Sequence, residues 1–200
     1  MTEQKKGLRE KYKPRQNMQS LILLMVGVGL ILISVVVFLA IPKAQAEVQQ
    51  AQQSSGYATP YEVNYPAPEV KITDLQNNPV ALSDYLGQVV LYNAWATWCP
   101  PCKEEMPTLD AYYKDHNSEG FVVVAIEDGE PLEEVAAYAR DNNLTFPIWP
   151  DIKWVATTAF KTNTLPSTFV IDRTGVVRLA WTGPITRDSL EKYVTPLIKE

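Results

Sequence analysis

Two cysteines lie two residues apart in this chain, and their type and spacing indicate chemistry more directly than any other feature. Cys99 and Cys102 enclose two prolines and follow the stretch Ala-Trp-Ala-Thr-Trp at 94–98. The chain has 200 residues and no other cysteine. A Cys-x-x-Cys pair is typical of thiol–disulfide exchange, in which a thiolate attacks a disulfide sulfur. The pair therefore predicts redox chemistry.

Two other interpretations of the pair stay open. A structural disulfide that closes so short a loop contributes only on the order of 2 kcal/mol to stability. Half of a zinc site is the second interpretation, but a closed structural zinc site has four ligands. Besides the two cysteines, the chain contains the single histidine His116, which we expect at the surface. Redox chemistry is the favoured interpretation.

The elements that must position the dithiol follow an alternating α/β pattern from Pro66 onward. Residues 89–95 form a continuous apolar run, which is typical of a strand buried on both faces. The dithiol follows directly. Residues 103–117 are then predicted to form a helix, with apolar side chains at three- and four-residue spacing and a kink at Pro107.

Further elements are expected on both sides of this unit. Strands are expected at 70–72, 121–126 and 145–149, with a hairpin of strands at 167–172 and 176–181. Helices are expected at 84–86 with Ser83 as its cap, at 131–142, at 152–160 and at 187–198. Residues 66–200 are long enough for one hydrophobic core.

Residues 21–41 are uncharged and almost wholly apolar, which predicts a transmembrane helix. At 1.5 Å per residue this segment is roughly 31 Å long, close to the thickness of the bilayer's hydrocarbon core. Residues 1–20 carry six basic and two acidic residues, whereas Lys43 is the only basic residue among the next twenty after the span. We therefore expect a single-pass plasma-membrane protein with a cytoplasmic N-terminus and an extracytoplasmic domain.

A cleaved signal peptide is the alternative for this segment, because Ala44-Gln45-Ala46 resembles a cleavage site. Secretory apolar cores usually run for about 7 to 15 residues, so an uncleaved anchor is favoured. Residues 42–65 are rich in Gln, Ala, Ser, Gly and Pro and predict a flexible linker. The expected organisation is a cytoplasmic segment at 1–20, an anchor at 21–41, a linker at 42–65 and a domain at 66–200.

The chain beyond residue 42 is acidic, with 12 basic and 21 acidic residues and a net charge of −9. Nucleic-acid binding requires clustered Lys and Arg on the surface, so this composition argues against nucleic acid as a partner. A basic or neutral protein partner fits such a surface better.

Three stretches of the sequence carry a family resemblance: 67–69 with 82–87, the central stretch 93–107 around the dithiol, and 165–172 with 183–184. Together they resemble the TlpA/ResA/CcmG group of membrane-anchored thioredoxin-like proteins. The resemblance spans residues 66–200. It implies a thioredoxin-like α/β fold with a central mixed sheet flanked by helices, and a thiol-disulfide oxidoreductase that uses neither a cofactor nor a metal.

The resemblance also implies roles for individual residues. Cys99 is the expected nucleophile and Cys102 the residue that resolves the mixed disulfide; independently, a helix N-terminus at Cys99 would favour its thiolate. Glu105 falls where the ResA branch has an acid near the dithiol, where it would accept the proton of Cys102. Without the family, Glu105 is a first-turn acid favoured by the helix dipole. Asn93 occupies the position of a buried Asp in thioredoxin and cannot act as a base.

A substrate-binding surface is expected around the dithiol. Pro166 matches the proline that the fold holds in the cis form, and the backbone of Leu165 beside it would pair with a substrate strand. Trp98 is expected to cover the dithiol and contact partners. The predicted substrate-binding residues are Trp98, Pro100, Pro101, Leu165 and Pro166.

The expected direction of the reaction follows from the two prolines between the cysteines. Pro100 and Pro101 have no backbone N–H, so a thiolate at Cys99 has fewer donors, and a less stabilised thiolate gives a more reducing couple. The resemblance implies a transmembrane thiol carrier as electron donor and apocytochrome c, before haem attachment, as one target. A dithiol oxidant and a non-catalytic binding or chaperone module remain the alternatives.

Overall fold

The computed structural model describes residues 22–30, Phe38 and residues 59–200. Residues 22–30 are helical, and their large apolar side chains are exposed. Among the described residues, no helix combines the length and the apolar character needed to cross a membrane. The rest of the predicted span 21–41, the predicted cytoplasmic segment 1–20 and the predicted linker up to residue 58 lie outside the described residues.

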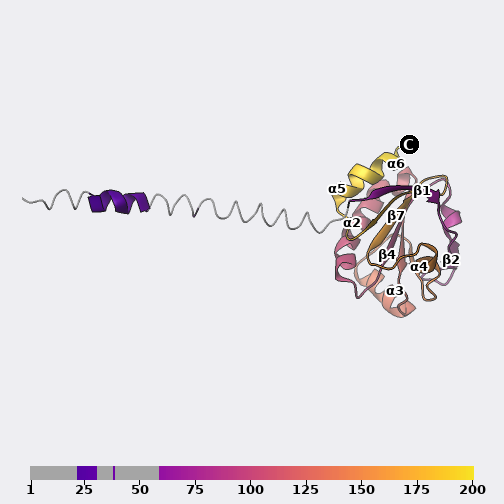
Figure 1. Cartoon of the computed structure of the whole chain (residues 1–200). Coiled ribbons are helices and arrows are strands. Elements are labelled where there is room, and N and C mark those ends of the chain that lie inside the picture. The colour runs from indigo at the N-terminus through magenta and orange to yellow at the C-terminus, as the bar shows by residue number, and fades with distance from the viewer. Residues whose placement is uncertain (1–21, 31–37, 39–58) are drawn as a thin grey trace, which may run out of the picture. The chain divides into compact units, whose positions relative to one another are not determined.

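Residues 59–200 are built around a six-stranded mixed sheet with the strand order β1-β8-β7-β4-β5-β6 (Figure 1). The parallel strands are β4 (Val89–Trp95), β5 (Phe121–Glu127) and β6 (Ile148–Pro150). The antiparallel additions are β7 (Ser167–Ile171), β8 (Val176–Thr182) and β1 (Tyr61–Pro66). A separate hairpin pairs β2 (Lys71–Thr73) with β3 (Pro79–Ala81). The predicted α/β fold with a central mixed sheet is confirmed.

The two central strands are buried because nearly all their side chains are apolar. β4 and β5 are parallel neighbours in register over all 7 residues of each strand. Alternate side chains of β4 enter different cores: Val89 and Leu91 lie on one face of the sheet, and Val90 and Tyr92 on the other. Each such apolar side chain contributes about 1.5–3 kcal/mol on burial, so the register of β4 is strongly specified.

Helices cover both faces of the sheet. The helices α2 (Pro100–His116) and α3 (Leu132–Asp141) contribute Leu109 and Val135 to one core. The turn η1 (Leu82–Tyr85) and the helix α4 (Val155–Ala159) contribute Leu82 and Ala156 to the other. The short turn η2 (Asn117–Glu119) follows α2. The sheet is thus enclosed between two helical layers.

The C-terminal helical region has three consecutive segments: α5 (Arg187–Ser189), the π-helical η3 (Leu190–Val194) and α6 (Thr195–Ile198). The widened turn precedes Pro196, which has no N–H to bond the carbonyl four residues earlier. Leu190 and Val194 are buried, and Tyr193 and Leu197 pack partly buried against the same core. The predicted inward face of 187–198 is therefore confirmed.

The predicted linker extends too far toward the C-terminus. Residues 61–65, assigned to the linker from their composition, belong to β1, which pairs antiparallel with β8 at the edge of the sheet. Five of the six side chains of β1 are exposed. The strand is held by backbone pairing with β8, so its hydropathy gave no strand signal.

Helix α2 begins earlier than predicted, at Pro100 instead of Lys103. Proline suits the first turn because its N–H would be unpaired there in any case. The helix continues through Pro107. His116, expected at the surface, is only 9% exposed and lies 4.4 Å from the Tyr112 ring between centroids.

Other boundaries shift by a few residues. The strands predicted at 70–72 and 145–149 are found at 71–73 and 148–150, and the helix predicted at 152–160 is found at 155–159. Ser83 is not a cap: Ala81 precedes η1, and its N–H donates to the Asp84 carboxylate at 2.8 Å. The Asp84 carboxylate inside the turn therefore accepts the hydrogen bond at the start of η1, and the predicted capping role of Ser83 is wrong.

The carboxylate of Asp110 fastens α2 to the segment before β6. Its Oδ1 accepts hydrogen bonds from the backbone N–H and the hydroxyl of Thr145, at 2.7 and 2.8 Å. Its other oxygen pairs with Lys114 one helical turn later. The Asp110 side chain is 9% exposed, whereas Thr145 and Lys114 lie at the surface, so these bonds are part-buried.

We expect Asp110→Ala to lower the free energy of unfolding by about 1–2 kcal/mol, because it removes the acceptor of two part-buried hydrogen bonds from Thr145. Urea denaturation of the full-length chain measures the change. The matched control is Asp141→Ala, whose side chain is 73% exposed and lies 3.8 Å from Arg140 Nε. The control should stay within about 0.5 kcal/mol of the parent, and equal losses in both variants would contradict the assignment.

Candidate active site

The cysteine pair lies at the start of α2, just after the end of β4. β4 ends at Trp95, and Cys99 is the N-cap of α2. Cys99 and Cys102 form a disulfide with 5.3 Å between their Cα atoms. Cys99 is 4% exposed and Cys102 is fully buried. A thiolate at the Cys99 position would lie at the positive end of the helix dipole.

The two prolines occupy the first turn of α2. Pro100 and Pro101 are the first two residues of the helix. Their fixed φ suits a helix start, but neither carries an N–H. The nearest following main-chain donor at this helix start is therefore the N–H of Cys102. Lys103 N–H is already used, since it donates to the Cys99 carbonyl at 3.1 Å.

An open hollow of about 330 Å³ adjoins the cysteines. It brings together predicted residues from two distant parts of the sequence, with others that were not predicted. Its lining consists of Trp98, Cys99, Pro100, Pro101, Asp128, Thr162, Asn163, Thr164 and Leu165. Trp98 is 64% exposed. The hollow can thus receive a partner chain against the dithiol.

The segment opposite the dithiol is held in a tight turn. The Leu165–Pro166 peptide bond is cis, as the resemblance implied. The Ser167 hydroxyl donates to the Thr164 carbonyl at 2.6 Å, and the Gly183 N–H donates to the Pro166 carbonyl at 2.8 Å. Pro166 itself is buried. Of this segment, Thr164 and Leu165 line the hollow, whereas Pro166, predicted to bind substrate, is not among its lining residues.

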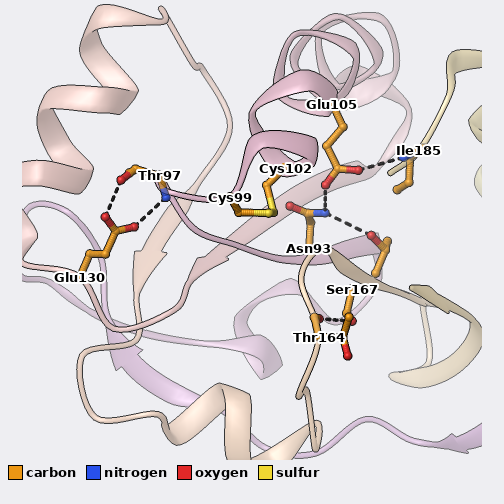
Figure 2. Close-up of a disulfide and its surroundings, with 10 residues drawn as sticks. Asn93, Thr97, Cys99, Cys102, Glu105, Glu130, Thr164, Ser167 and Ile185 are labelled. Carbon is orange, nitrogen blue, oxygen red and sulfur yellow. Dashed lines mark hydrogen bonds between the residues drawn. A yellow bond between two sulfur atoms is a disulfide. The ribbon is translucent and has the colours of Figure 1, made fainter. Parts of the chain in front are cut away.

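Glu105 lies in the interior, 2% exposed, one turn after Cys102 on α2 (Figure 2). Its Oε1 accepts a hydrogen bond from Asn93 Nδ2 at 2.7 Å, and its Oε2 accepts one from the Ile185 N–H at 2.9 Å. Burial raises the pKa of Glu105 to about 7, although the two donors favour the charged form. A carboxyl group that titrates near neutrality can both accept and return a proton.

Asn93 connects this carboxyl to the sheet. It lies in β4, fully buried, and its Nδ2 donates to both Glu105 Oε1 and Thr168 Oγ1, the second at 3.1 Å. Among the described residues, its Oδ1 has no hydrogen-bond partner. The buried amide therefore joins β4, α2 and β7.

An acidic loop on the other side of the dithiol was not predicted from the sequence. The Glu130 carboxylate accepts hydrogen bonds from both the N–H and the hydroxyl of Thr97, two residues before Cys99 (Figure 2). Burial and the neighbouring carboxylates of Glu130 and Asp128 raise the pKa of the fully buried Glu127 to about 8. The sequence feature that could have indicated this loop is the group of three acids in four residues, 127–130, at the end of a buried strand parallel to β4.

The same region shows no sign of a metal centre. Within 22–30, 38 and 59–200, no group of three or more His, Cys, Asp or Glu side chains is arranged to hold a metal ion. The two cysteines bond to each other. The arrangement is one for exchange between thiols and disulfides.

A family model described as the AhpC/TSA family matches residues 63–180. Two relatives are each named "Thiol-disulfide oxidoreductase ResA". The one from Geobacillus kaustophilus (strain HTA426) is 38% identical over 128 residues, which are 64% of this chain and 74% of that protein. The one from Bacillus subtilis (strain 168) is 34% identical over 133 residues, 66% of this chain and 74% of that protein.

Solved structures are similar over the same region. A thioredoxin-family thiol:disulfide interchange protein from Chlorobium tepidum TLS has a TM-score of 0.63 at 27% identity, covering 68% of this chain and 97% of that one. StoA from Bacillus subtilis has a TM-score of 0.57 at 24% identity, covering 64% and 97%, and shares the fold. The chain therefore belongs to the AhpC/TSA family, as a thioredoxin-like thiol-disulfide oxidoreductase similar to ResA.

Proposed function

We propose that this enzyme reduces disulfides of protein substrates outside the cytoplasm, with Cys99 as nucleophile and Cys102 as resolving residue. The observation that carries the proposal is the position of Cys99, at the N-cap of α2 and on the wall of an open hollow, with Cys102 buried one turn further. Of the two sulfurs, that of Cys99 is placed to meet a partner. The buried Cys102 sulfur can reach the Cys99 sulfur, to which it is bonded in the bridged form.

The reaction proceeds in two exchanges. The Cys99 thiolate attacks one sulfur of the substrate disulfide, which breaks that bond and forms a mixed disulfide, and the other substrate sulfur leaves as a thiolate. Cys102 then loses its proton to the Glu105 carboxylate and attacks the Cys99 sulfur. The substrate leaves as a dithiol once its thiolates take up protons, and the Cys99–Cys102 bridge remains. A partner dithiol must reduce that bridge before the next cycle.

The reducing direction is supported by the helix start. Pro100 and Pro101 withhold two of the N–H groups that would otherwise stabilise a Cys99 thiolate. A hydrogen bond to a charged group is worth about 1.5–3 kcal/mol, so each missing donor matters. A less stabilised thiolate makes the dithiol a better electron donor.

The proposed location is the plasma membrane, with a single N-terminal anchor at 21–41 and the domain on the extracytoplasmic side. Six basic residues precede the anchor, in keeping with a cytoplasmic N-terminus. The helical residues 22–30 expose Leu23, Met25 and Leu30 by more than 60% each. Exposed apolar side chains on all sides of a helix are typical of a segment that lies in lipid.

The proposed partners follow from this location and from the charge of the domain. A transmembrane thiol carrier would supply electrons across the membrane. Apocytochrome c is a proposed target, because haem attachment to a Cys-x-x-Cys-His sequence needs both thiols. The acidic composition beyond residue 42 favours basic or neutral protein segments.

We expect Cys102→Ser to accumulate mixed disulfides between Cys99 and substrate proteins, because the resolving thiol is absent. Non-reducing electrophoresis and mass spectrometry of the full-length chain from intact cells measure the adducts. Cys99→Ser is the matched control and should form none. A non-catalytic module would retain its function in Cys99→Ser, and that result would contradict the enzyme mechanism.

The Cys99–Cys102 couple should have a reduction potential near that of thioredoxin, about −270 mV, because its helix start lacks two thiolate-stabilising donors. Equilibration with glutathione or dithiothreitol buffers, followed by thiol alkylation, measures the potential. A value near about −120 mV, as in strong disulfide-forming oxidants, would instead identify the chain as an oxidant.

Glu105→Gln should slow the resolving step about a hundredfold at neutral pH. The Glu105 pKa is about 7, so the carboxyl group is neutral below that pH and becomes a base above it. The parent rate should therefore rise through pH 7, and this rise should be missing in Glu105→Gln. Single-turnover reduction of a peptide disulfide measures both. Glu104→Gln, at the exposed neighbouring position, is the control and should keep the parent profile.

A further inference from the structure

Of the two polar atoms of the Asn93 carboxamide, the nitrogen forms hydrogen bonds with described residues and the oxygen does not. Its Nδ2 donates two hydrogen bonds, to Glu105 Oε1 at 2.7 Å and to Thr168 Oγ1 at 3.1 Å. Its Oδ1 is buried and has no partner among the described residues. Figure 2 shows this oxygen pointing toward the Cys99–Cys102 bridge, on the side away from Glu105.

The orientation of the amide is fixed by its neighbours. An ionised carboxylate only accepts hydrogen bonds, so Nδ2 must face Glu105 when that group is charged. This choice turns Oδ1 toward the sulfurs. Leaving a buried carbonyl unpaired is costly, and such a group in a native structure calls for an explanation, a redox role being one of the known kinds.

On the side of Asn93 where Figure 2 shows Oδ1, the sulfur atoms are the groups whose hydrogen-bonding capacity changes during the reaction. A disulfide sulfur carries no hydrogen, whereas a thiol is a donor. Reduction by a dithiol breaks the Cys99–Cys102 bond, adds two electrons and two protons to the pair, and converts the donor's two thiols into a disulfide. Cys102 is fully buried in the bridged form, so an S–H formed at this position would take its acceptor from the protein and not from water.

We propose that Asn93 is a positioning residue whose Oδ1 accepts a hydrogen bond from the Cys102 thiol in the reduced enzyme. The amide then bridges Cys102 and Glu105, with the thiol at its oxygen and the carboxyl group at its nitrogen. The proposal rests on the proposed function only in requiring that the pair cycles between bridge and dithiol.

This bond exists in one redox state only, so it stabilises the dithiol relative to the disulfide. Its loss makes the couple more reducing. The bond also holds the Cys102 thiol against the same amide that donates to Glu105 Oε1. Asn93 therefore positions both partners of the proton transfer.

The test is the reduction potential of Asn93→Leu, a change that keeps the side-chain size and removes the acceptor. We expect the equilibrium constant with a reference dithiol to shift about tenfold toward the bridged form, which is about 30 mV for a two-electron couple. The potential is measured on the full-length chain at pH 5, where Glu105 is protonated because its pKa is about 7. A change in the charge of Glu105 therefore cannot produce the shift.

The matched control is Thr168→Val. It removes the other partner of Asn93 Nδ2 and leaves Oδ1 in place, so its potential should stay within about twofold of the parent in the same equilibrium constant. An unchanged potential in folded Asn93→Leu, or an equal shift in Thr168→Val, overturns the proposal.

A second measurement needs no change at Asn93. In Cys99→Ser, Cys102 is the only thiol, and its S–H stretching band in the infrared reports hydrogen bonding directly. We expect the band at lower frequency than that of an alkanethiol in hexane. A band at the hexane position overturns the proposal, even where Asn93→Leu does not fold. Neither measurement uses a protein substrate, so a failure of substrate trapping leaves this result independent.

Discussion

Strand β4 is hydrogen-bonded along both edges and packed on both faces, and the candidate active site depends on this confinement. β5 pairs with it in parallel and β7 in antiparallel. Its carboxyl end, at Trp95, is fully buried. Because the strand cannot move, the loop that follows it delivers Cys99 to the helix start at a defined place. The cysteine pair therefore follows a strand whose residues are all buried.

The buried Glu105 behind the dithiol is tolerated because each of its two oxygens accepts a hydrogen bond. Glu105 is buried, and its two donors come from β4 and from Ile185, 80 residues further along the chain. Burial outweighs these donors, so the Glu105 pKa rises to about 7. An acid that loses its proton near neutrality suits the proton transfer proposed for Glu105.

The surface in front of the dithiol has a different character. Trp98 is exposed, Leu165 lines the hollow, and Asp128 adds a carboxylate at its edge. The Glu130 carboxylate holds Thr97 just before the cysteines, so the acidic loop after β5 and the redox loop after β4 are linked. Both loops follow the carboxyl ends of parallel strands, where α/β proteins place their binding sites. The surface in front of the dithiol thus combines the apolar side chains of Trp98 and Leu165 with the polar side chain of Asp128.

The sequence by itself determined the features that are encoded over short distances. The apolar run of β4, the hairpin of β7 and β8, the helix after the dithiol and the cysteine pair were all evident, because strand and helix periods and turn residues act within a few positions. The family resemblance added the cis proline at 166 and drew attention to Glu105.

Only the tertiary structure decided which distant groups meet. The exposed strand β1 carried no hydropathy signal, since backbone pairing with β8 holds it. The contacts of Asn93 with Thr168, of Glu105 with Ile185 and of Glu130 with Thr97 join residues 75, 80 and 33 positions apart. Local propensity does not contain such pairings, because they depend on strand register and on how the helices pack. The burial that raises the Glu105 pKa arises in the same way, from neighbours that only the folded chain brings together.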